Sequence, residues 1–437
     1  MTMVGIGPRG QRALPHPWWT PVRLALALAT VMFALTVVAK TPCAEGAWWS
    51  PPRDDANLCA SRLPAEYAIG GLAEGVPALS TSDGRFQTSA SSAPQAVLSY
   101  VVGQATRVLS GWPDSAERQS VSIDDVAAMP RVRAEAVVYV GLAALLQLLA
   151  LLAIVRWCID LVPARQTFAL AGAPLLVFAG LVGWDLVPAA LAVGAIRLWH
   201  LRRPVPAGAV LGVAAAWAFW PIALAVAFLA VGLRQHDRSA VGRSLTVAFG
   251  VFVALGVVAA ALTGGASNEF YLSWLGSAAG DGSLAAVAAA LGVDVTASLL
   301  TLVVLCVGSL LVLAVFARAV RARHAPSVSA VAVATLVAML VVQKSVEPGY
   351  ALWLLPLAVL AYPDVPGRMR DLLVWQGCEI LFIVASWWHS GEFTYGLSGH
   401  DPVYLLAICL RVAAELWLAW RLLTPRSYVA DGVPVRG

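Results

Sequence analysis

The sequence has little charge. Only 12% of its 437 residues are charged and 59% are hydrophobic, whereas about 25% are charged in an ordinary soluble domain. A water-soluble protein with this balance could not cover its surface, so lipid is the expected solvent for most of the chain. The net charge of +4 is small, and no stripe of basic and aromatic residues predicts a nucleic-acid groove. We expect a membrane protein without a nucleic-acid partner.

Cysteine is also scarce. The six cysteines form no CxxC pair, and no cluster of histidine and cysteine occurs, so neither a metal site nor a cofactor is expected. Four of them lie in or beside apolar stretches, where a lone cysteine acts as a small hydrophobic residue: Cys158, Cys306, Cys378 and Cys409. The other two, Cys43 and Cys59, share one polar segment.

An obvious leader-peptide cleavage site is missing as well. After Arg9, Arg12 and Arg23, an apolar run continues to Lys40 without a clear small-residue cleavage site. This pattern favours a retained signal anchor, with a cut near residue 39 as the alternative.

Long apolar stretches dominate what is present. The predicted transmembrane helices are 22–39, 136–155, 244–262, 296–317, 327–342, 349–362, 371–388 and 402–422. Two longer runs are broken. The run 168–200 is interrupted at Trp184-Asp185 and again at Pro188, and the run 206–233 at Trp220-Pro221. Each run predicts a hairpin of two short helices. We therefore expect an all-α polytopic bundle of about 10–12 spans, some shorter than the roughly 20 residues that cross a bilayer.

Basic residues predict the orientation, because cytoplasmic loops are enriched in them. Arginines occupy alternate short connections: Arg9, Arg12, Arg156, Arg165, Arg202, Arg203, Arg234, Arg238, Arg243, Arg318, Arg321, Arg323, Arg368, Arg370, Arg421 and Arg426. The connections between them, around 263–293, 343–348 and 389–401, contain a single basic residue, Lys344. Both termini are therefore expected in the cytoplasm of a multi-pass cell-membrane protein.

Five segments follow from this topology. They are a cytoplasmic N-terminus (1–21), a first transmembrane helix (22–39), an extracytoplasmic loop with an interfacial helix (40–135), a helical bundle (136–422) and a cytoplasmic tail (423–437). A loop this long is expected to carry function. Within it, residues 63–75 predict a short helix with a glycine stop, and the amphipathic segment 94–111 predicts the interfacial helix.

Cys43 and Cys59 would face the oxidising side of the membrane. A disulfide across this separation of sixteen residues would stabilise the fold by about 3 kcal/mol in the chain-entropy model. It would hold Asp55 inside a small ring and Arg62 just beyond it. The alternative is a pair of free thiols in a flexible loop.

A few polar residues fall in or beside the spans. Asp185 lies between two half-helices, either as a functional acid within the membrane or as a helix cap at the outer interface. Lys344 and Glu347 stand at the outer end of a span, close to Tyr350. Their charges could contact a phosphate or a sugar, or form a solvated pair.

Three further charges lie in the last two spans. Arg411 and Glu415 are four residues apart, so we expect them to pair on one helical face in a structural role. Glu379 is expected to be isolated. Intramembrane carboxylates are too few and too scattered for a proton or ion relay.

The order of several segments resembles a known family. These segments are KTPC at 40–43, GWDLVPAALAV at 183–193, RRPVPAGAVLGVAAA at 202–216, EFYLSWLGSAAGDGSL at 269–284, EPGYALWLLPLAVLA at 347–361, LLVWQ at 372–376 and YLLAICLRVAAELWLAW at 404–420. No single one is a strong motif, but together they resemble the actinobacterial branch of glycosyltransferase family 87, polytopic enzymes of the GT-C class.

The resemblance implies an activity in the cell envelope. Such enzymes transfer mannose or a related hexose from a polyprenyl-phosphate donor to a lipid or glycan acceptor outside the membrane, without a nucleotide sugar or an essential metal. A carboxylate early in the first external loop is expected to act as general base on the acceptor hydroxyl. Membrane lipids, the donor and the acceptor are therefore the expected partners. The candidate binding residues are Arg62, Asp185, Lys344, Glu347 and Tyr350.

At the base itself the chain departs from the family. The resemblance implies an aspartate in a Cys-x-Ser-Asp pattern, but this chain has Arg62 there, and arginine stays protonated. A nearby acid, Asp55 or Glu66, could have taken over, since an i+4 shift from Arg62 to Glu66 keeps the helical face. Alternatively, Arg62 binds donor phosphate in a protein that no longer catalyses, or the local correspondence is displaced by a few residues.

The resemblance alone does not decide whether the chain is an active enzyme, and two other classes of function fit the sequence. One rival from another class is a transporter or flippase of a lipid-linked sugar, because broken helices often line binding sites. Another is a non-catalytic subunit that binds a lipid-linked sugar or a partner enzyme.

Overall fold

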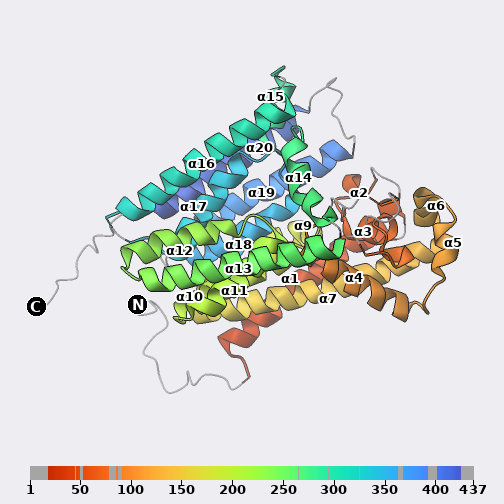
Figure 1. Ribbon diagram of the computed structural model, residues 1–437, viewed down its shortest axis with the longest axis horizontal. Coiled ribbons are helices and arrows are strands. Elements are labelled where there is room, and N and C mark those ends of the chain that lie inside the picture. The colour runs from red at the N-terminus through yellow and green to blue at the C-terminus, as the bar shows by residue number, and fades with distance from the viewer. Residues whose placement is uncertain are drawn as a thin grey trace, which may run out of the picture.

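The computed structural model describes most of the chain. It covers residues 18–44, 46–49, 53–77, 85–86, 91–263, 265–293, 295–323, 325–362, 368–391 and 401–424. Every regular element within these residues is helical, which confirms the predicted all-α class (Figure 1). Most of the predicted cytoplasmic ends, 1–21 and 423–437, lies outside the described residues.

Six helices are long and apolar enough to cross a membrane. They are α1 (Pro21–Ala44), α7 (Pro130–Leu161), α13 (Arg238–Thr263), α16 (Ala297–Arg321), α19 (Arg368–Ser390) and α20 (Pro402–Leu423). Because helices satisfy their own backbone hydrogen bonds, such segments are stable in hydrocarbon. The chain is a multi-pass membrane protein.

Five shorter apolar elements complete the bundle. They are α10 (Leu186–His200), α11 (Pro204–Trp217), α12 (Ile222–Arg234), α17 (Val328–Val341) and α18 (Ala351–Ala361), the last preceded by the 3-10 turn η5 (Pro348–Tyr350). Nearly every residue of α17 and α18 is buried, whereas α13 and α16 expose many large apolar side chains. The short helices therefore form the centre, and α13 and α16 present an apolar surface that suits lipid.

The two broken runs differ in detail. The second is interrupted between α11 and α12, as predicted. The first contains α8 (Ala164–Ala171) and α9 (Leu175–Ala179) before the break that leads to α10. The prediction of one short helix in that first arm is therefore wrong. Pro174 causes the extra break, because it lacks the backbone N–H needed to continue α8 beyond Gly172. The expected interruption at Pro188 is also wrong, because Pro188 lies in the first turn of α10, where a proline is tolerated.

The first loop folds into a cap at one end of the bundle (Figure 1). Its elements are η1 (Ala47–Trp49), α2 (Arg53–Ala56), α3 (Leu63–Ile69), η2 (Leu72–Glu74), α4 (Ala93–Leu109), α5 (Ser115–Gln119) and α6 (Ile123–Ala128). The helix predicted at 63–75 is α3, which stops at Gly70 and is followed by η2. The amphipathic segment predicted at 94–111 is α4.

A buried ion pair joins this cap to α7. Arg118 donates to both carboxylate oxygens of Glu135, at 2.8 and 2.7 Å, and Tyr67 donates to the same carboxylate at 2.8 Å. A bidentate arginine–carboxylate pair adds geometric specificity to its energy. Arg118 also donates to the Ala73 carbonyl, so α3, η2, α5 and α7 are held in one arrangement.

The connection between α13 and α16 contains η4 (Ala266–Asn268), α14 (Glu269–Gly276) and α15 (Leu284–Ala290). Lys344 fixes it, because its ammonium donates to the carbonyls of Trp274, Leu275 and Ser277 at 2.8 to 3.0 Å. Lys344 also donates to Thr301 at 2.7 Å. The end of α17 thereby holds α14 beside α16.

Candidate functional site at the cap end of the bundle

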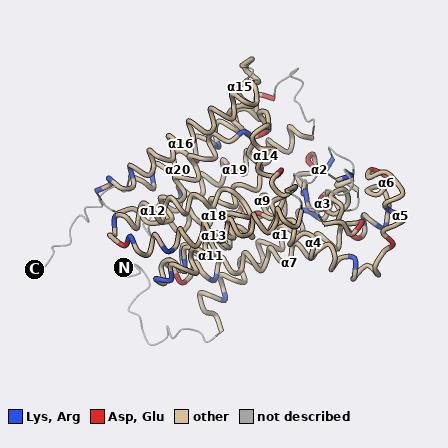
Figure 2. The backbone as a smooth tube through the Cα atoms, viewed as in Figure 1, with Lys and Arg blue, Asp and Glu red and all other residues tan. Residues whose placement is uncertain are grey.

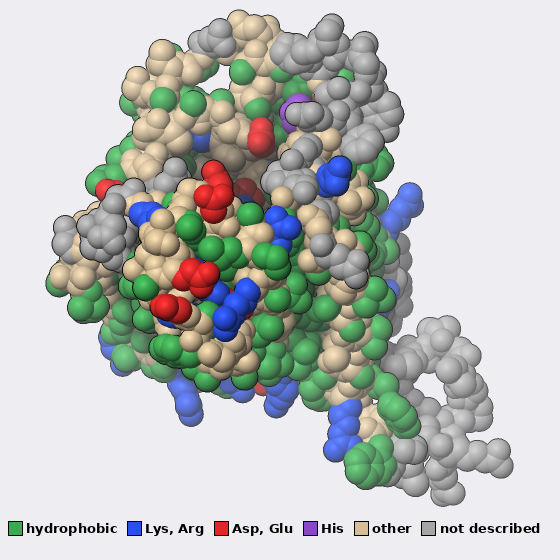
Figure 3. Space-filling view, turned by 90° about the vertical axis from the view of Figure 1, so that its right-hand side faces the viewer, with side chains coloured by type: hydrophobic (Ala, Val, Ile, Leu, Met, Phe, Trp, Pro, Cys, Tyr) green, Lys and Arg blue, Asp and Glu red, His purple; other side chains and the backbone are tan. Residues whose placement is uncertain are grey.

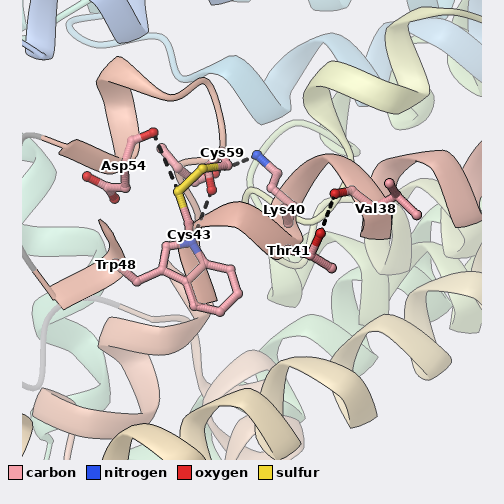
Figure 4. The surroundings of a disulfide bond; sticks show 8 residues. Val38, Lys40, Thr41, Cys43, Trp48, Asp54 and Cys59 are labelled. Carbon is pink, nitrogen blue, oxygen red and sulfur yellow. Dashed lines mark hydrogen bonds between the residues drawn. A yellow bond between two sulfur atoms is a disulfide. The ribbon is translucent and has the colours of Figure 1, made fainter. Parts of the chain in front are cut away.

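The chain leading to Arg62 is held from both sides. Cys43 and Cys59 form the predicted disulfide, with 6.0 Å between their Cα atoms (Figure 4). Lys40 donates to the Ala60 carbonyl at 2.6 Å and lies 4.4 Å from the ring centroid of Trp387 on α19. The start of the cap is therefore tied to both α1 and α19.

Two hydrogen bonds then attach this segment to the break before α10. Ser61 donates to the Leu181 carbonyl at 2.6 Å, and the Arg62 backbone N–H donates to the Val182 carbonyl at 2.9 Å. The first loop and the first broken run therefore meet at Arg62. This contact brings Arg62 close to Asp185.

Arg62 stands at the centre of a polar cluster. Its guanidinium pairs with Glu347, and both side chains remain partly exposed, at 58% and 34%. Its charge also acts on Asp185 and Tyr350. Trp353 donates to the Asp185 carboxylate at 2.9 Å and stacks on Tyr350 with ring centroids 3.7 Å apart. We call Arg62, Asp185, Glu347 and Tyr350 the outer cluster.

The tight approach of η5 positions this cluster. A Cβ atom at Gly349 would lie 2.1 Å from an oxygen of Asp185, so only glycine allows the backbone to pass there. Burial raises the pKa of Asp185, while the Arg62 guanidinium and the Trp353 N–H act in the opposite direction. The carboxyl at 185 is therefore held between a cation and an indole donor.

Glu66 lies beside the outer cluster on α3. Its carboxylate accepts hydrogen bonds from Ser99 at 2.6 Å, from Trp184 at 2.9 Å and from Tyr139 at 3.1 Å. Because Trp184 directly precedes Asp185 in the chain, the hydrogen bond from Trp184 connects Glu66 to the outer cluster. The side chain is only partly buried. Burial raises the pKa of Glu66, and the Ser99, Trp184 and Tyr139 hydrogen bonds lower it.

Asp55 lies on α2, inside the disulfide ring. Burial and the neighbouring Asp54 raise its pKa to about 6, against the opposing charge of Lys40. In the described part of the chain, no hydrogen bond or ion pair is seen between Asp55 and the outer cluster. Of the five predicted binding residues, the structure gathers four and directs Lys344 toward α14 and α16 instead.

The central part of the chain matches a known protein family. The profile of glycosyltransferase family 87 matches residues 126–343, half of the chain. The chain belongs to glycosyltransferase family 87. No curated protein matches the chain. Family membership implies a membrane glycosyltransferase. The matched residues of this family 87 protein run from α6 to the end of α17 and include Asp185, whereas Arg62, Glu66 and Glu347 lie outside them.

The cap end of the family 87 protein is hollowed (Figure 3), and acidic and basic side chains gather around the hollow. Sequence reasoning missed Trp184 and Trp353, whose indole N–H groups orient Glu66 and Asp185. The only signal in the sequence is that Trp184 directly precedes Asp185 and that Trp353 follows Tyr350 by three residues. Among the described residues, no group of three or more metal-ligating side chains is found.

A second charged group of the family 87 protein lies inside the bundle. Arg411 and Glu415 pair within α20 at 3.7 Å, as their spacing predicts. Glu379 accepts a hydrogen bond from Trp375 at 2.9 Å, and its carboxyl lies close enough to Glu415 and Arg411 for their charges to interact. The expectation that Glu379 is isolated is therefore wrong, because the packing of α19 on α20 brings the two glutamates together. We call Arg411, Glu415 and Glu379 the inner triad.

Proposed function

We propose that the protein transfers a hexose, with mannose as the first candidate, from a polyprenyl phosphate to a hydroxyl of a lipid or glycan acceptor. The observation that supports this is the outer cluster. Together with the adjacent Glu66, this cluster places one cation, three acids and aromatic rings at a hollowed face of a family 87 bundle. A lipid-linked donor can approach such a site from the bilayer, while the acceptor enters from the aqueous side.

The arginine distribution supports the orientation that this activity needs. Basic side chains concentrate at the ends of the helices opposite the cap (Figure 2). They include Arg156 and Arg197, which both bind Asp160, and Arg234, which caps the end of α16 through the Ala322 carbonyl. Cytoplasmic ends carry this excess of arginine. We infer that both termini face the cytoplasm and that the cap, residues 40–135 of the predicted topology, lies outside.

Arg62 is the proposed phosphate ligand. A guanidinium is always charged and matches phosphate geometry, and this one is more than half exposed. Its present partner, Glu347, is also accessible, so a phosphate can replace that carboxylate without uncovering an unpaired buried charge. Asp185 and Tyr350 then shape the sugar side of the site.

Glu66 is the proposed base. A general base works best when its pKa lies near the operating pH, and burial shifts the pKa of Glu66 upward. In the transfer, the acceptor O–H gives its proton to Glu66 as the acceptor oxygen bonds to the sugar C1. The bond between C1 and the phosphate oxygen breaks, and the electron pair leaves with polyprenyl phosphate. Asp55 is the rival base, since its pKa of about 6 is also suitable.

A non-catalytic binding protein is the second candidate. It is favoured by the presence of Arg62 where the family resemblance implies an acid. A flippase for the same lipid-linked sugar would use the same binding groups without breaking the glycosidic bond.

One assay separates these functions. The protein in lipid nanodiscs is given radiolabelled polyprenyl-phosphate mannose and an extract of native lipid acceptors. We expect label in the acceptor fraction, loss of at least about a hundredfold in rate for Glu66→Gln, and a rate near wild type for Asp55→Asn. The reverse pattern of the two variants would assign the base to Asp55.

Measurements of donor binding and of donor movement distinguish the non-catalytic protein from the flippase. Labelled donor that binds but never transfers, with any acceptor, would support the non-catalytic candidate. Movement of the intact donor between leaflets of sealed vesicles would support the flippase. Absence of both binding and transfer would overturn the proposed donor class.

A further inference from the structure

A cavity lies at the end of the bundle opposite the cap, where basic side chains gather (Figure 2). Its volume is about 180 Å³, which is less than the roughly 300–1,000 Å³ of pockets that enclose a whole drug-sized ligand. We call it the basal cavity, and its size suits a small headgroup rather than a nucleotide. Its wall is formed by Trp199, Arg202, Pro204, Asp237, Ala240 and Arg243.

Three helix ends build the basal cavity, away from the outer cluster. Trp199 lies at the end of α10, Pro204 is the first residue of α11, and Asp237 directly precedes α13. α10 begins at Leu186, next to Asp185 of the outer cluster, and its 15 residues rise about 22 Å at 1.5 Å per residue. The basal cavity is therefore separated from the outer cluster by the length of α10.

Helix packing fixes the wall of the basal cavity. Gly208, one turn beyond Pro204, lies against the Ser244 carbonyl of α13, and no room remains there for a Cβ atom. On the α10 side, the Trp199 ring stacks on Phe228 of α12 with ring centroids 4.4 Å apart. The helices on both sides of the cavity are therefore held by close contacts, and the cavity is a built part of the bundle.

Positive charge predominates on this wall. Asp237 uses both of its carboxylate oxygens, since Oδ1 accepts from the Ala240 N–H at 3.3 Å and Oδ2 lies 3.4 Å from Nη1 of Arg202. Arg243 donates through Nε to the Ser239 carbonyl at 3.3 Å, and its two Nη groups have no partner among the described residues. Two guanidinium groups therefore outnumber one carboxylate that is already engaged, and the cavity favours an anion.

A neutral donor is available beside these charges. The indole N–H of Trp199 makes no hydrogen bond within the part of the chain that the structure describes, and its side chain is partly accessible. Charge-assisted hydrogen bonds from a guanidinium to a phosphate are short and strong, and an indole N–H can add a further donor. The wall therefore offers three donor side chains to the oxygens of one phosphate.

Arg202 has a backbone conformation that arginine rarely adopts. Its φ is 58°, in the left-handed region that glycine enters without steric cost. Two backbone hydrogen bonds fix the turn, from the Arg202 N–H to the Trp199 carbonyl and from the Arg203 N–H to the Leu198 carbonyl, both at 3.0 Å. Glycine is the usual residue where a helix ends in this way. An arginine held there against its backbone preference points to a use for its side chain.

Apolar side chains flank the basal cavity. Leu201 and Val205, the chain neighbours of the wall residues Arg202 and Pro204, are 50% and 47% exposed. In a membrane-spanning bundle, exposed apolar side chains of this kind suit contact with acyl chains. Basic pockets between transmembrane helices bind anionic lipid headgroups. A phosphate in the cavity, with acyl chains along Leu201 and Val205, would satisfy both the charged wall and its apolar rim.

We propose that the basal cavity binds the phosphate of an anionic phospholipid from the leaflet opposite the cap, with Arg202, Arg243 and Trp199 as its donors. The bound headgroup connects the ends of α10 and α13, so the lipid stabilises the folded bundle. The site is separate from the proposed transfer reaction. Emptying it should leave the affinity of the outer cluster for polyprenyl phosphate unchanged.

Native mass spectrometry tests the ligand class. The full-length protein in detergent is titrated with dioleoyl phosphatidylglycerol or dioleoyl phosphatidylcholine, with and without millimolar glycerol 3-phosphate. We expect phosphatidylglycerol to bind at least about tenfold more tightly than phosphatidylcholine, without competition from glycerol 3-phosphate. Equal affinity for the two lipids would overturn the anionic class. Competition by glycerol 3-phosphate would assign the cavity to a soluble phosphate instead of a lipid.

Two variants test the position of the site. Arg202→Gly removes the guanidinium but suits the left-handed backbone, so phosphatidylglycerol affinity should fall roughly tenfold, while the melting temperature in phosphatidylcholine should not fall. Arg318→Ala removes an exposed arginine near the end of α16 that does not line the cavity, and it should alter neither property. A loss in Arg202→Gly no greater than in Arg318→Ala would overturn the site.

Trp199→Phe tests the neutral donor. Phenylalanine retains a ring that can stack on Phe228 but lacks the N–H, so phosphatidylglycerol affinity should fall roughly threefold to tenfold. The affinity for phosphatidylcholine should change less, because this lipid is not expected to occupy the cavity. Unchanged phosphatidylglycerol affinity would exclude the indole as a ligand, and thermal melting verifies that the variant is folded.

Discussion

Two arginine–glutamate pairs of this protein differ in their surroundings. Arg62 and Glu347 come from distant parts of the chain and meet at the cap end of the bundle, where both remain accessible. Arg411 and Glu415 lie one helical turn apart inside the bundle, at 1% and 2% exposure. The accessible pair can exchange one partner for a ligand, whereas the buried pair cannot separate without leaving a charge in an apolar interior. The same two residue types therefore suit binding in one place and structure in the other.

Breaking the inner triad should have the largest effect. Arg411→Leu leaves Glu415 and Glu379 together without a cation, so unfolding free energy should fall by about 3–5 kcal/mol. Denaturation in mixed micelles, followed by tryptophan fluorescence, measures the loss. The double variant Arg411→Leu, Glu415→Leu should recover most of it, because apolar replacement of both partners is often neutral. A single variant as stable as wild type would contradict the structural role.

Removing the disulfide should destabilise the segment that carries Arg62 without changing the stability of the inner helices. In Cys43→Ser, Cys59→Ser, the segment that carries Arg62 should lose about 3 kcal/mol of stabilisation. Hydrogen exchange of residues 53–62 should quicken by roughly a hundredfold, while the inner helices α17 and α18 keep their protection. Cys306→Ser removes an exposed free thiol and serves as the control. Unchanged exchange at 53–62 would show that other contacts suffice to order the segment.

Breaking the outer pair should change binding more than stability. Arg62→Ala should shift unfolding free energy by no more than about 1 kcal/mol, since exposed ion pairs contribute little. Affinity for polyprenyl phosphate should fall roughly tenfold to a hundredfold. Arg202→Ala breaks a comparably exposed pair with Asp237 at the opposite end and should alter neither property. An equal affinity loss in both variants would indicate a general charge effect.

The smallest effect should be a pH dependence from Asp55. Its pKa rises from 3.8 to about 6 on folding, with burial as the main cause. The folded state therefore binds more protons than the unfolded state between these values, and stability from this group is lost as pH rises through the window. In Asp55→Asn, the unfolding midpoint should depend less on pH between 4 and 6. An identical pH profile in both proteins would contradict the shift.

The positions of the long helices could be predicted from sequence, because each apolar stretch must be a helix in lipid. The disulfide could be predicted from two cysteines in one polar segment after the first apolar stretch. The i,i+4 pairing of Arg411 with Glu415 also followed from local geometry. Each of these features depends on residues that lie near one another in the sequence, so the sequence pattern predicts it.

Contacts between distant segments could not be predicted in this way. The approach of Glu379 to Glu415 depends on how α19 packs against α20, and the hydrogen bond from Trp353 to Asp185 depends on how α18 packs beside the start of α10. Lys344 illustrates the limit most clearly. Its charge at a span end suggested a ligand contact, but the fold brings four acceptors to its ammonium.

The outer cluster also bears on how the protein is made. Arg62, Asp185 and Glu347 come from the early, middle and late parts of the chain, and synthesis delivers them in that order. The segment that carries Arg62 is therefore synthesised long before its partner Glu347 leaves the ribosome. The site is completed only when the last third of the bundle has been inserted, so a truncated product would reach the membrane without a working site.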